Sequence, residues 1–397
     1  MTGLDAVTVV APDGTELLHD VTLLAGPTEL LGILGPSGSG KSTVLRAIAG
    51  LTPVQGGDVL IGGRSVLRVP PHRRRLAMVF ETPALIPFLD VEDNVTWGMR
   101  ARHRPDPEIR DRLRTRSAML RLGRLLGRRP AGLSAGERGL VGLGRALLDV
   151  PAAFLLDEPL GHLDPPERMR MRHAVADLVH GVAVPAFFVT HDQTDVLGVA
   201  DRIAVVNGGR VVQLGTTREL YDEPADLFVA GFVGAPAMGL LPGRLVASGG
   251  WAGVQVGNRT LPLWTPLAPS VRDQVGRDVV LGLRPHDVLD GASPSKAETV
   301  TLPAVAESVE HLGPETVVTV TVDAPPVRAP GADPPSGDRA QLRARYPAAT
   351  AVRRGDRLVV AVDATHAHVF DPTSGRALWH PASDDAPRPD EGISRLR

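Results

Sequence analysis

The sequence predicts an α/β domain over residues 1–235 and a smaller β-rich domain over 236–380. Short apolar runs that alternate with helical patterns indicate the first domain, as does a glycine-rich loop that joins the run 30–34 to a helix. After residues 234–236 the chain changes to short alternating segments punctuated by Gly and Pro, which favours a small β-barrel. We expect a polar, disordered tail over 381–397.

Length and charge limit the classes of protein to which the chain can belong. Its 397 residues suffice for two or three domains, and a net charge of -2 argues against a general nucleic-acid binder. Cysteine is absent, which excludes disulfides, thiolate metal sites and a thiol nucleophile. We see no signal peptide and no window with the ~18 apolar residues of a spanning helix. We therefore expect a cytoplasmic protein without a nucleic-acid partner, which reaches a membrane only through another subunit.

Two antiparallel strands are expected to begin the α/β domain. Apolar residues alternate or cluster over 4–10 and 17–24, on either side of a Pro-Asp-Gly turn. The apolar run 30–34 follows as a strand, and residues 44–51 continue as a helix that Gly50 ends. A strand, a loop and a helix therefore follow one another directly.

The loop between this strand and this helix ends in Lys-Ser-Thr and matches the P-loop pattern G-x-x-x-x-G-K-S/T at every fixed position. Glycines let the backbone curl around a phosphate, and the helix presents the positive end of its dipole to it. Lys41 is placed to reach the outer phosphates of a nucleotide, and Ser42 to hold Mg²⁺. The predicted nucleotide-binding residues are Gly35, Pro36, Ser37, Gly38, Ser39, Gly40, Lys41, Ser42 and Thr43.

A helical insertion is expected over about 83–150, after two short strands at 58–61 and 76–80. Its pattern is dense in Arg and Leu, and its core candidates are Leu113, Leu120, Leu122, Leu125 and Leu126. Within it, the stretch Leu133, Ser134, Ala135, Gly136 and Glu137 opens a further helix. Ser134 as N-cap and Glu137 three residues later form a capping-box pattern, which by itself indicates only a helix start.

Polar side chains follow two later strands of the domain. Residues 152–156 predict a buried parallel strand that runs directly into Asp157 and Glu158, and residues 186–189 predict another that ends shortly before His191. Open α/β sheets bind ligands at the carboxyl ends of such strands. Asp157 is therefore placed to hold Mg²⁺ through its water shell, Glu158 to orient or deprotonate water, and His191 to contact a γ-phosphate.

Together these motifs resemble those of the ATP-binding cassette (ABC) transporter ATPases. The resemblance rests on the P-loop at 35–43, the signature at 133–137, the acidic strand end at 154–159, Leu163 and Asp164 of the D-loop, and the switch residue His191. It narrows to the importer ATPases of the maltose-type carbohydrate family through three later stretches, which are Phe228–Met238, Gly282–Pro285 and Phe370–Pro372.

The resemblance implies a P-loop ABC ATPase domain with a helical subdomain, followed by a β-rich, OB-like (TOBE-type) regulatory domain. It implies an ATP-binding and ATP-hydrolysing importer subunit that uses ATP and Mg²⁺, with Glu158 and His191 as catalytic residues. Two identical or related subunits sandwich two ATP molecules, so that each P-loop faces the signature of the other subunit. The implied partners are integral membrane permease subunits and, indirectly, an extracytoplasmic solute-binding protein. The protein is then expected peripherally, at the cytoplasmic face of the cell membrane.

Among the departures from the family pattern, two concern the nucleotide site. No Phe, Tyr or Trp precedes Phe80, although the family usually places an adenine-stacking aromatic near the end of the first strand. Stacking on a base is worth roughly 1–3 kcal/mol, so weaker or less base-selective binding is expected. Glu81 stands where the family has the glutamine of the Q-loop. Its carboxylate can still ligate Mg²⁺ together with Ser42 and Asp157, but it adds negative charge close to the phosphates.

Alternative functions stay open at this stage. Glu81 and the missing aromatic are compatible with a degenerate nucleotide-binding regulatory or partner subunit of low ATPase activity. The imported solute is expected to be a sugar, with a polyamine, a phosphate ester or a metal ion as alternatives, because the ATPase does not touch the solute in this architecture. A homodimer and a heterodimer are equally compatible with the sequence.

Overall fold

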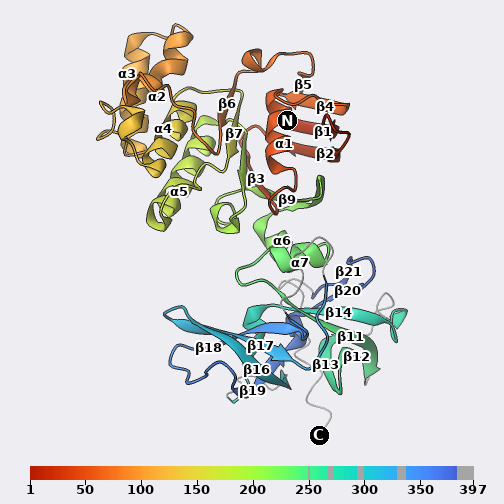
Figure 1. Ribbon diagram of the computed structural model, residues 1–397. Helices are drawn as coiled ribbons and strands as arrows, with labels where there is room; N and C mark the ends of the chain where they lie inside the picture. Colours follow the sequence, from red (N-terminus) through yellow and green to blue (C-terminus); the bar gives the residue numbers. More distant parts are fainter. Residues whose placement is uncertain (249–250, 267–271, 293–298, 329–336, 382–397) are drawn as a thin grey trace. The chain divides into compact units, whose positions relative to one another are not determined.

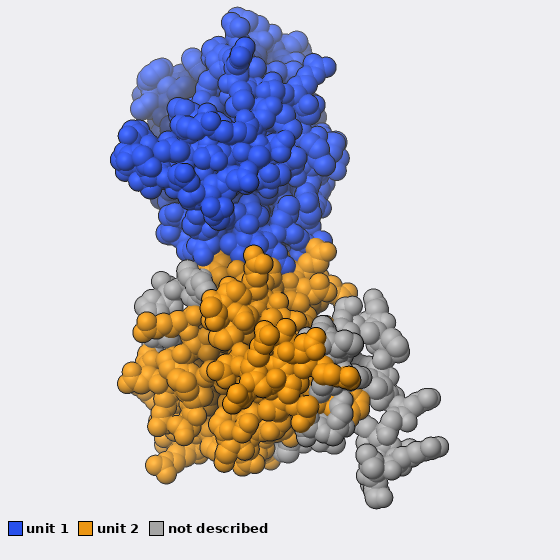
Figure 2. Space-filling model, turned by 90° about the vertical axis from the view of Figure 1, so that its right-hand side faces the viewer, with its two compact units in different colours: residues 1–217 blue, residues 218–397 orange. Residues whose placement is uncertain are grey.

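The computed structural model describes residues 1–248, 251–266, 272–292, 299–328 and 337–381 (Figure 1). The tail predicted over 381–397 lies outside them except for its first residue. The chain forms two compact units, Met1–Thr217 and Arg218–Arg397, which Figure 2 shows in blue and orange.

The boundary between the units falls after the first residue of α6 (Thr217–Asp222) and before α7 (Leu227–Phe232), whereas the sequence predicts it near residue 235. Backbone hydrogen bonds explain the difference, because they join residues 225–227 to residues 375–377 of the second unit. Leu227 N–H donates to the Gly375 carbonyl at 2.9 Å, and Leu227 also packs in one apolar cluster with Phe370.

A six-stranded sheet forms the centre of the first unit, in the order β10-β9-β3-β8-β7-β6. The five strands from β9 to β6 run parallel, and β10 pairs antiparallel at the edge. Every residue of β3, β7 and β8 is buried, as expected for a parallel sheet covered on both faces. The strands are β3 (Leu30–Leu34), β6 (Leu76–Val79), β7 (Ala153–Asp157), β8 (Ala186–Thr190), β9 (Arg202–Asn207) and β10 (Arg210–Gly215).

A second, antiparallel sheet has the order β2-β1-β4-β5 and confirms the strand pair predicted at the N-terminus. One apolar cluster contains side chains of both sheets and of α1 (Lys41–Ala49), among them Leu23, Ile48 and Phe187. Helix α1 is therefore held between the sheets, with its first residue at the carboxyl end of β3. The strands are β1 (Thr2–Val10), β2 (Glu16–Ala25), β4 (Gly56–Ile61) and β5 (Arg64–Ser65).

The predicted helical insertion consists mainly of α2 (Val91–Ala101), α3 (Asp106–Met119) and α4 (Ala135–Leu147), and α5 (Pro165–Val182) follows β7 (Figure 1). Of its predicted core leucines, only Leu126 is less than fully buried. Glycines of α4 permit close packing, since a Cβ on Gly142 would lie 2.9 Å from Pro83 Cβ and one on Gly144 would lie 2.6 Å from Leu122 Cδ1. Those glycines weaken the helix by propensity but let its neighbours approach.

The second unit contains a closed barrel, as the sequence predicts, and also a six-stranded sheet. Both contribute to one apolar cluster, which includes Leu241, Val254 and Val318. Pro242 and Gly243 interrupt the alternation of β11, and Pro262 interrupts that of β13. The sheet strands are β11 (Gly239–Ser248), β12 (Trp251–Val256), β13 (Arg259–Pro266), β14 (Asp278–Leu283), β20 (His368–Phe370) and β21 (Ala377–Trp379). The barrel strands are β15 (Val288–Asp290), β16 (Thr299–His311), β17 (Glu315–Val322), β18 (Gln341–Pro347) and β19 (Arg357–Asp363).

Candidate functional site

The loop between β3 and α1 closes around the ammonium group of Lys41. Lys41 Nζ donates to the carbonyl oxygen of Gly35 at 2.9 Å and to that of Pro36 at 2.7 Å. Burial lowers the pKa of Lys41, while the negative charges of Glu158 and Asp157 act in the opposite direction. Two backbone carbonyl oxygens therefore accept hydrogen bonds from Lys41 here. Phosphate oxygens can replace them when a nucleotide binds.

The N-terminus of α1 is open to an anion. Its N-cap residue is Gly40, at a φ of 102°, which has no side chain to accept hydrogen bonds from the first backbone N–H groups. The hydroxyl of Ser39 is buried and has no hydrogen-bond partner among the described residues. A Cβ on Gly35 would lie 2.1 Å from the Val206 carbonyl oxygen, so the loop follows a path open only to glycine. These unsatisfied donors fit a phosphate group.

Ser42 and Asp157 meet at the carboxyl end of β7. Ser42 Oγ donates to Asp157 Oδ1 at 2.9 Å, and Asp157 is only 5% exposed. Burial raises the pKa of the Asp157 carboxyl, and the Ser42 hydrogen bond and the Arg46 charge partly oppose this rise. A hydroxyl and a carboxylate suit Mg²⁺, which takes one or two protein oxygens and completes its shell with phosphates and water. In the part of the chain that the structure describes, no group of three or more His, Asp or Glu is placed to hold a metal unaided.

Glu158 and His191 follow the adjacent strands β7 and β8 and contact each other. His191 Nδ1 lies 2.8 Å from both carboxylate oxygens of Glu158, with the Glu158 side chain 15% exposed and that of His191 61% exposed. The Glu158 backbone is left-handed, with a φ of 49°, and its N–H donates to the Val189 carbonyl at 3.0 Å. Such strained backbone concentrates at functional sites.

Arg168 joins two segments of the site and is not among the residues predicted from the sequence. It lies in α5, and its Nη1 is 2.7 Å from Asp192 Oδ2, directly after His191. Its Nε donates to the Leu160 carbonyl oxygen at 3.3 Å. Asp164 is the N-cap of the same helix and accepts from the Glu167 N–H at 2.9 Å. No local sequence pattern distinguishes Arg168 from the many other arginines of the chain.

The signature residues begin α4, and in the view of Figure 1 the strands β6 and β7 lie between α4 and α1. The predicted capping box is confirmed, because Ser134 Oγ accepts from Glu137 N–H at 3.1 Å and Glu137 Oε2 accepts from Ser134 N–H at 2.9 Å. The Ser134 N–H holds the pKa of the Glu137 carboxyl below its usual range. A Cβ on Gly136 would lie 3.1 Å from the His162 carbonyl oxygen, so the D-loop packs closely on this helix start.

Glu81 follows β6 and is exposed. Its negative charge raises the pKa of Asp157, yet within the described residues its carboxylate makes no hydrogen bond to Asp157 or Ser42. The Glu81 carbonyl oxygen lies 2.8 Å from His162 Nε2, which joins the Q-loop position to the D-loop. The proposed metal-ligand role of Glu81 thus rests only on the effect of its charge on Asp157.

Comparison with known proteins identifies the family. The ABC transporter family matches residues 18–161. The chain is 40% identical over 365 residues to the sn-glycerol-3-phosphate import ATP-binding protein UgpC of Cereibacter sphaeroides, covering 92% of this chain and 96% of that protein. It is 36% identical over 394 residues to the trehalose import ATP-binding protein SugC of Mycobacterium tuberculosis, covering 95% and 98%. The chain belongs to the ABC transporter ATPases.

Within that family it belongs with the maltose-type importer ATPases. Solved structures agree: the dimeric structure of a post-hydrolysis ATP-binding cassette bound to ADP and Pi has a TM-score of 0.51 and 28% identity, covering 55% of this chain and 99% of that one. This ABC ATPase is an ATP-binding and ATP-hydrolysing importer subunit. Among its described residues, no helix is both long and apolar enough to span a membrane.

Proposed function

We propose that this ABC ATPase hydrolyses ATP with Mg²⁺ at the site formed by Lys41, Ser42, Asp157, Glu158 and His191. One observation carries the proposal: these side chains gather at the carboxyl ends of three neighbouring parallel strands, β3, β8 and β7. Hydrolysis of a nucleoside triphosphate needs a phosphate cradle, a metal-holding carboxylate and a group that orients water, and we assign these roles to the P-loop, Asp157 and Glu158.

Each residue takes a role that its contacts allow. Lys41 exchanges its two loop carbonyls for phosphate oxygens and neutralises their charge. Mg²⁺ held by Ser42 and Asp157 offsets the charge of the phosphates when it is bound. Glu158 accepts a proton from water as the water oxygen bonds to the γ-phosphorus and the bond to the ADP oxygen breaks. His191 holds the Glu158 carboxylate through Nδ1, which leaves Nε2 for the γ-phosphate.

A second subunit completes each site in this proposal. The signature residues begin a helix that is separate from the chain's own P-loop, and a structurally similar cassette is dimeric. Ser134 and the N–H of Gly136 then contact the γ-phosphate held by the P-loop of the other subunit, and the start of α4 adds its positive dipole. Residues 1–235 act as the nucleotide-binding domain and 236–380 as a regulatory domain.

The proposed dimer consists of identical or related subunits and lies peripherally at the cytoplasmic face of the cell membrane. It drives permease subunits, to which an extracytoplasmic solute-binding protein delivers the solute. The solute is a carbohydrate, which the similarity to a trehalose import protein supports. A polyol phosphate is the second candidate, which the similarity to a glycerol-3-phosphate import protein favours.

Uptake measurements separate these solutes. A strain lacking this chain is complemented with the wild type or with Glu158→Gln, and uptake of labelled trehalose and labelled glycerol-3-phosphate is compared. We expect the wild type to restore one solute and Glu158→Gln to restore neither, because the variant lacks the group that takes the proton from water. Uptake restored equally by both variants would exclude hydrolysis at this site as the driving reaction.

A subunit of low ATPase activity remains a second candidate function because Glu81 adds negative charge beside Asp157. In that case Glu81→Gln removes the charge and raises the rate of ATP hydrolysis severalfold. The matched control is Glu92→Gln, an equal change of charge in the first turn of α2. An unchanged rate in Glu81→Gln, measured as phosphate release, would argue against this candidate.

A further inference from the structure

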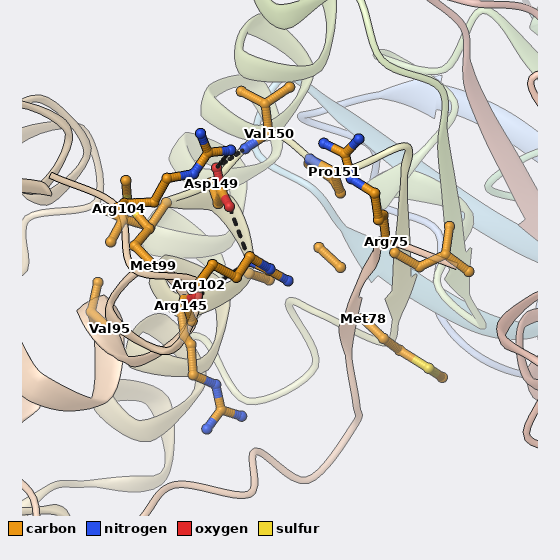
Figure 3. A pocket seen from close by; sticks show the side chains of 15 residues that line it. Arg75, Met78, Val95, Met99, Arg102, Arg104, Arg145, Asp149, Val150 and Pro151 are labelled. Carbon is orange, nitrogen blue, oxygen red and sulfur yellow. Dashed lines mark hydrogen bonds and ion pairs between the residues drawn. The ribbon is translucent and has the colours of Figure 1, made fainter. Parts of the chain in front are cut away.

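We propose that a cavity of about 190 Å³ in the first unit binds a small anion that carries phosphate groups. The cavity lies between β6, the C-terminal end of α2, and the segment that joins α4 to β7 (Figure 3). We call it the arginine cavity, because its polar lining includes Arg75, Arg102 and Arg104 around Asp149. It is distinct from the nucleotide site, since it opens at the amino ends of β6 and β7 rather than their carboxyl ends.

Positive charge exceeds negative charge around this cavity. The Asp149 carboxylate is shared by three guanidinium groups, with Arg102 Nη1 at 2.9 Å, Arg112 Nη1 at 3.3 Å and Arg104 Nη2 at 3.8 Å. Of these three, only Arg112 pairs with a second carboxylate among the described residues, that of Glu108 at 2.9 Å. The charge on Asp149 is therefore overcompensated, and an anion can approach Arg102 and Arg104 without facing an unpaired carboxylate.

Arg75 supplies a further positive charge to the lining of the cavity. Its side chain is exposed and faces the cavity across from Asp149, and no ion pair reaches it within the described residues (Figure 3). Its backbone is left-handed, with a φ of 55°, and its carbonyl accepts from Ala152 N–H at 2.8 Å. The strained backbone of Arg75 is thus fixed by the segment that begins β7, as is common where position matters for function.

The loop after α2 brings Arg102 and Arg104 to the same carboxylate, that of Asp149. His103, between Arg102 and Arg104, is also left-handed, with a φ of 55°, and the reversal lets both neighbours reach Asp149. Arg145 also lines the cavity, but its guanidinium turns away to the Ala84 carbonyl at 2.7 Å (Figure 3). Three guanidinium groups therefore face a ligand: Arg102 and Arg104, which also pair with Asp149, and Arg75, directly before β6.

Size and chemistry define the class of ligand. Pockets for drug-sized molecules hold about 300–1,000 Å³, so this smaller cavity suits a compact anion rather than a whole nucleotide. Guanidinium groups bind phosphate through paired hydrogen bonds, which favours a phosphate over a halide or a single carboxylate. Inorganic pyrophosphate matches these requirements and serves as the probe.

The test measures pyrophosphate binding to the full chain by titration calorimetry. All proteins carry Lys41→Ala, which removes the cation of the P-loop, and only the binding that depends on Arg75 is assigned to the arginine cavity. We expect a dissociation constant below about 1 mM, and we expect Arg75→Gln to weaken binding about tenfold. Arg75→Lys, which keeps the charge, should lose less, and higher salt should weaken binding further.

Controls separate this site from general attraction of anions. Arg64→Gln makes the same change of charge on the exposed strand β5, outside the cavity, and should leave affinity unchanged. Three results would each overturn the proposal: equal affinities of the Arg75→Gln variant and its parent, no binding by the parent, or an equal loss of affinity in Arg64→Gln.

A lipid source of phosphate is tested with phosphatidylglycerol vesicles. Arg75-dependent sedimentation with vesicles, in the absence of pyrophosphate binding, would also overturn it.

Discussion

Helices α1 and α4 both begin with residues of the nucleotide-binding motifs, yet their first turns are completed in opposite ways. Gly40 leaves the start of α1 without a side-chain cap and with no acidic residue in its first turn. Ser134 and Glu137 complete the start of α4 with two reciprocal hydrogen bonds. The first helix start therefore lacks an acceptor that a phosphate can supply, whereas the second is satisfied by its own chain.

In the proposed function, this difference would let one chain bind ATP at α1 and leave α4 to act on the ATP of a second subunit. Bare N–H groups at α1 gain the most from an anion, because nothing else pairs with them. At α4 the Ser134 hydroxyl accepts from Glu137 and keeps its own proton to donate, so it can still bind a phosphate across an interface. Glu137 brings a negative charge to the same place, which Arg128 at 3.2 Å partly balances.

The largest effect is expected at the open helix start. Lys41→Ala should lower the rate of ATP hydrolysis about 100-fold or more, because no other cation lies within the loop that surrounds the phosphates. Phosphate release at saturating ATP measures the effect, and Arg64→Ala on exposed β5 is the control for loss of one positive charge. A rate above one tenth of wild type would contradict the role given to Lys41.

A smaller effect is expected at the self-capped helix start. Ser134→Ala removes the acceptor for Glu137 N–H and should lower the free energy of unfolding by about 1 kcal/mol. Urea unfolding measures it, with Thr28→Ala, an exposed hydroxyl before β3, as the control. If Ser134→Ala matched wild-type stability, the cap would contribute nothing and the contrast with α1 would disappear.

The smallest effect concerns pH. Hydrogen bonding to Ser134 N–H lowers the pKa of Glu137, so its stabilisation is present above the pKa of the unfolded chain and is lost as pH falls through the lowered value. Glu137→Gln keeps an oxygen acceptor without a titrating group, so the stability of the variant should fall less on acidification. Thermal unfolding between neutral and acidic pH tests this, and identical pH profiles would contradict it.

Local patterns predicted the motifs well, and packing decided the rest. The P-loop, the Ser134–Glu137 capping box and the buried strands before Asp157 and His191 follow from neighbours within a few residues, and the structure confirms those elements. The ion pair between Arg168 and Asp192 joins distant segments, and no local spacing in the sequence predicts it.

The sequence by itself determined the helix starts, because capping and backbone hydrogen bonds join residues three or four positions apart. Only the tertiary structure decided which chain segments share a core. Thus Gly142 is a weak helix former in the sequence and a close contact to Pro83 in the fold. In the same way, α7 follows the first unit along the chain, but its Leu227 N–H donates to Gly375 in the loop between β20 and β21. The apolar area that folding buries depends on which distant segments come into contact. These contacts form only when the whole chain packs.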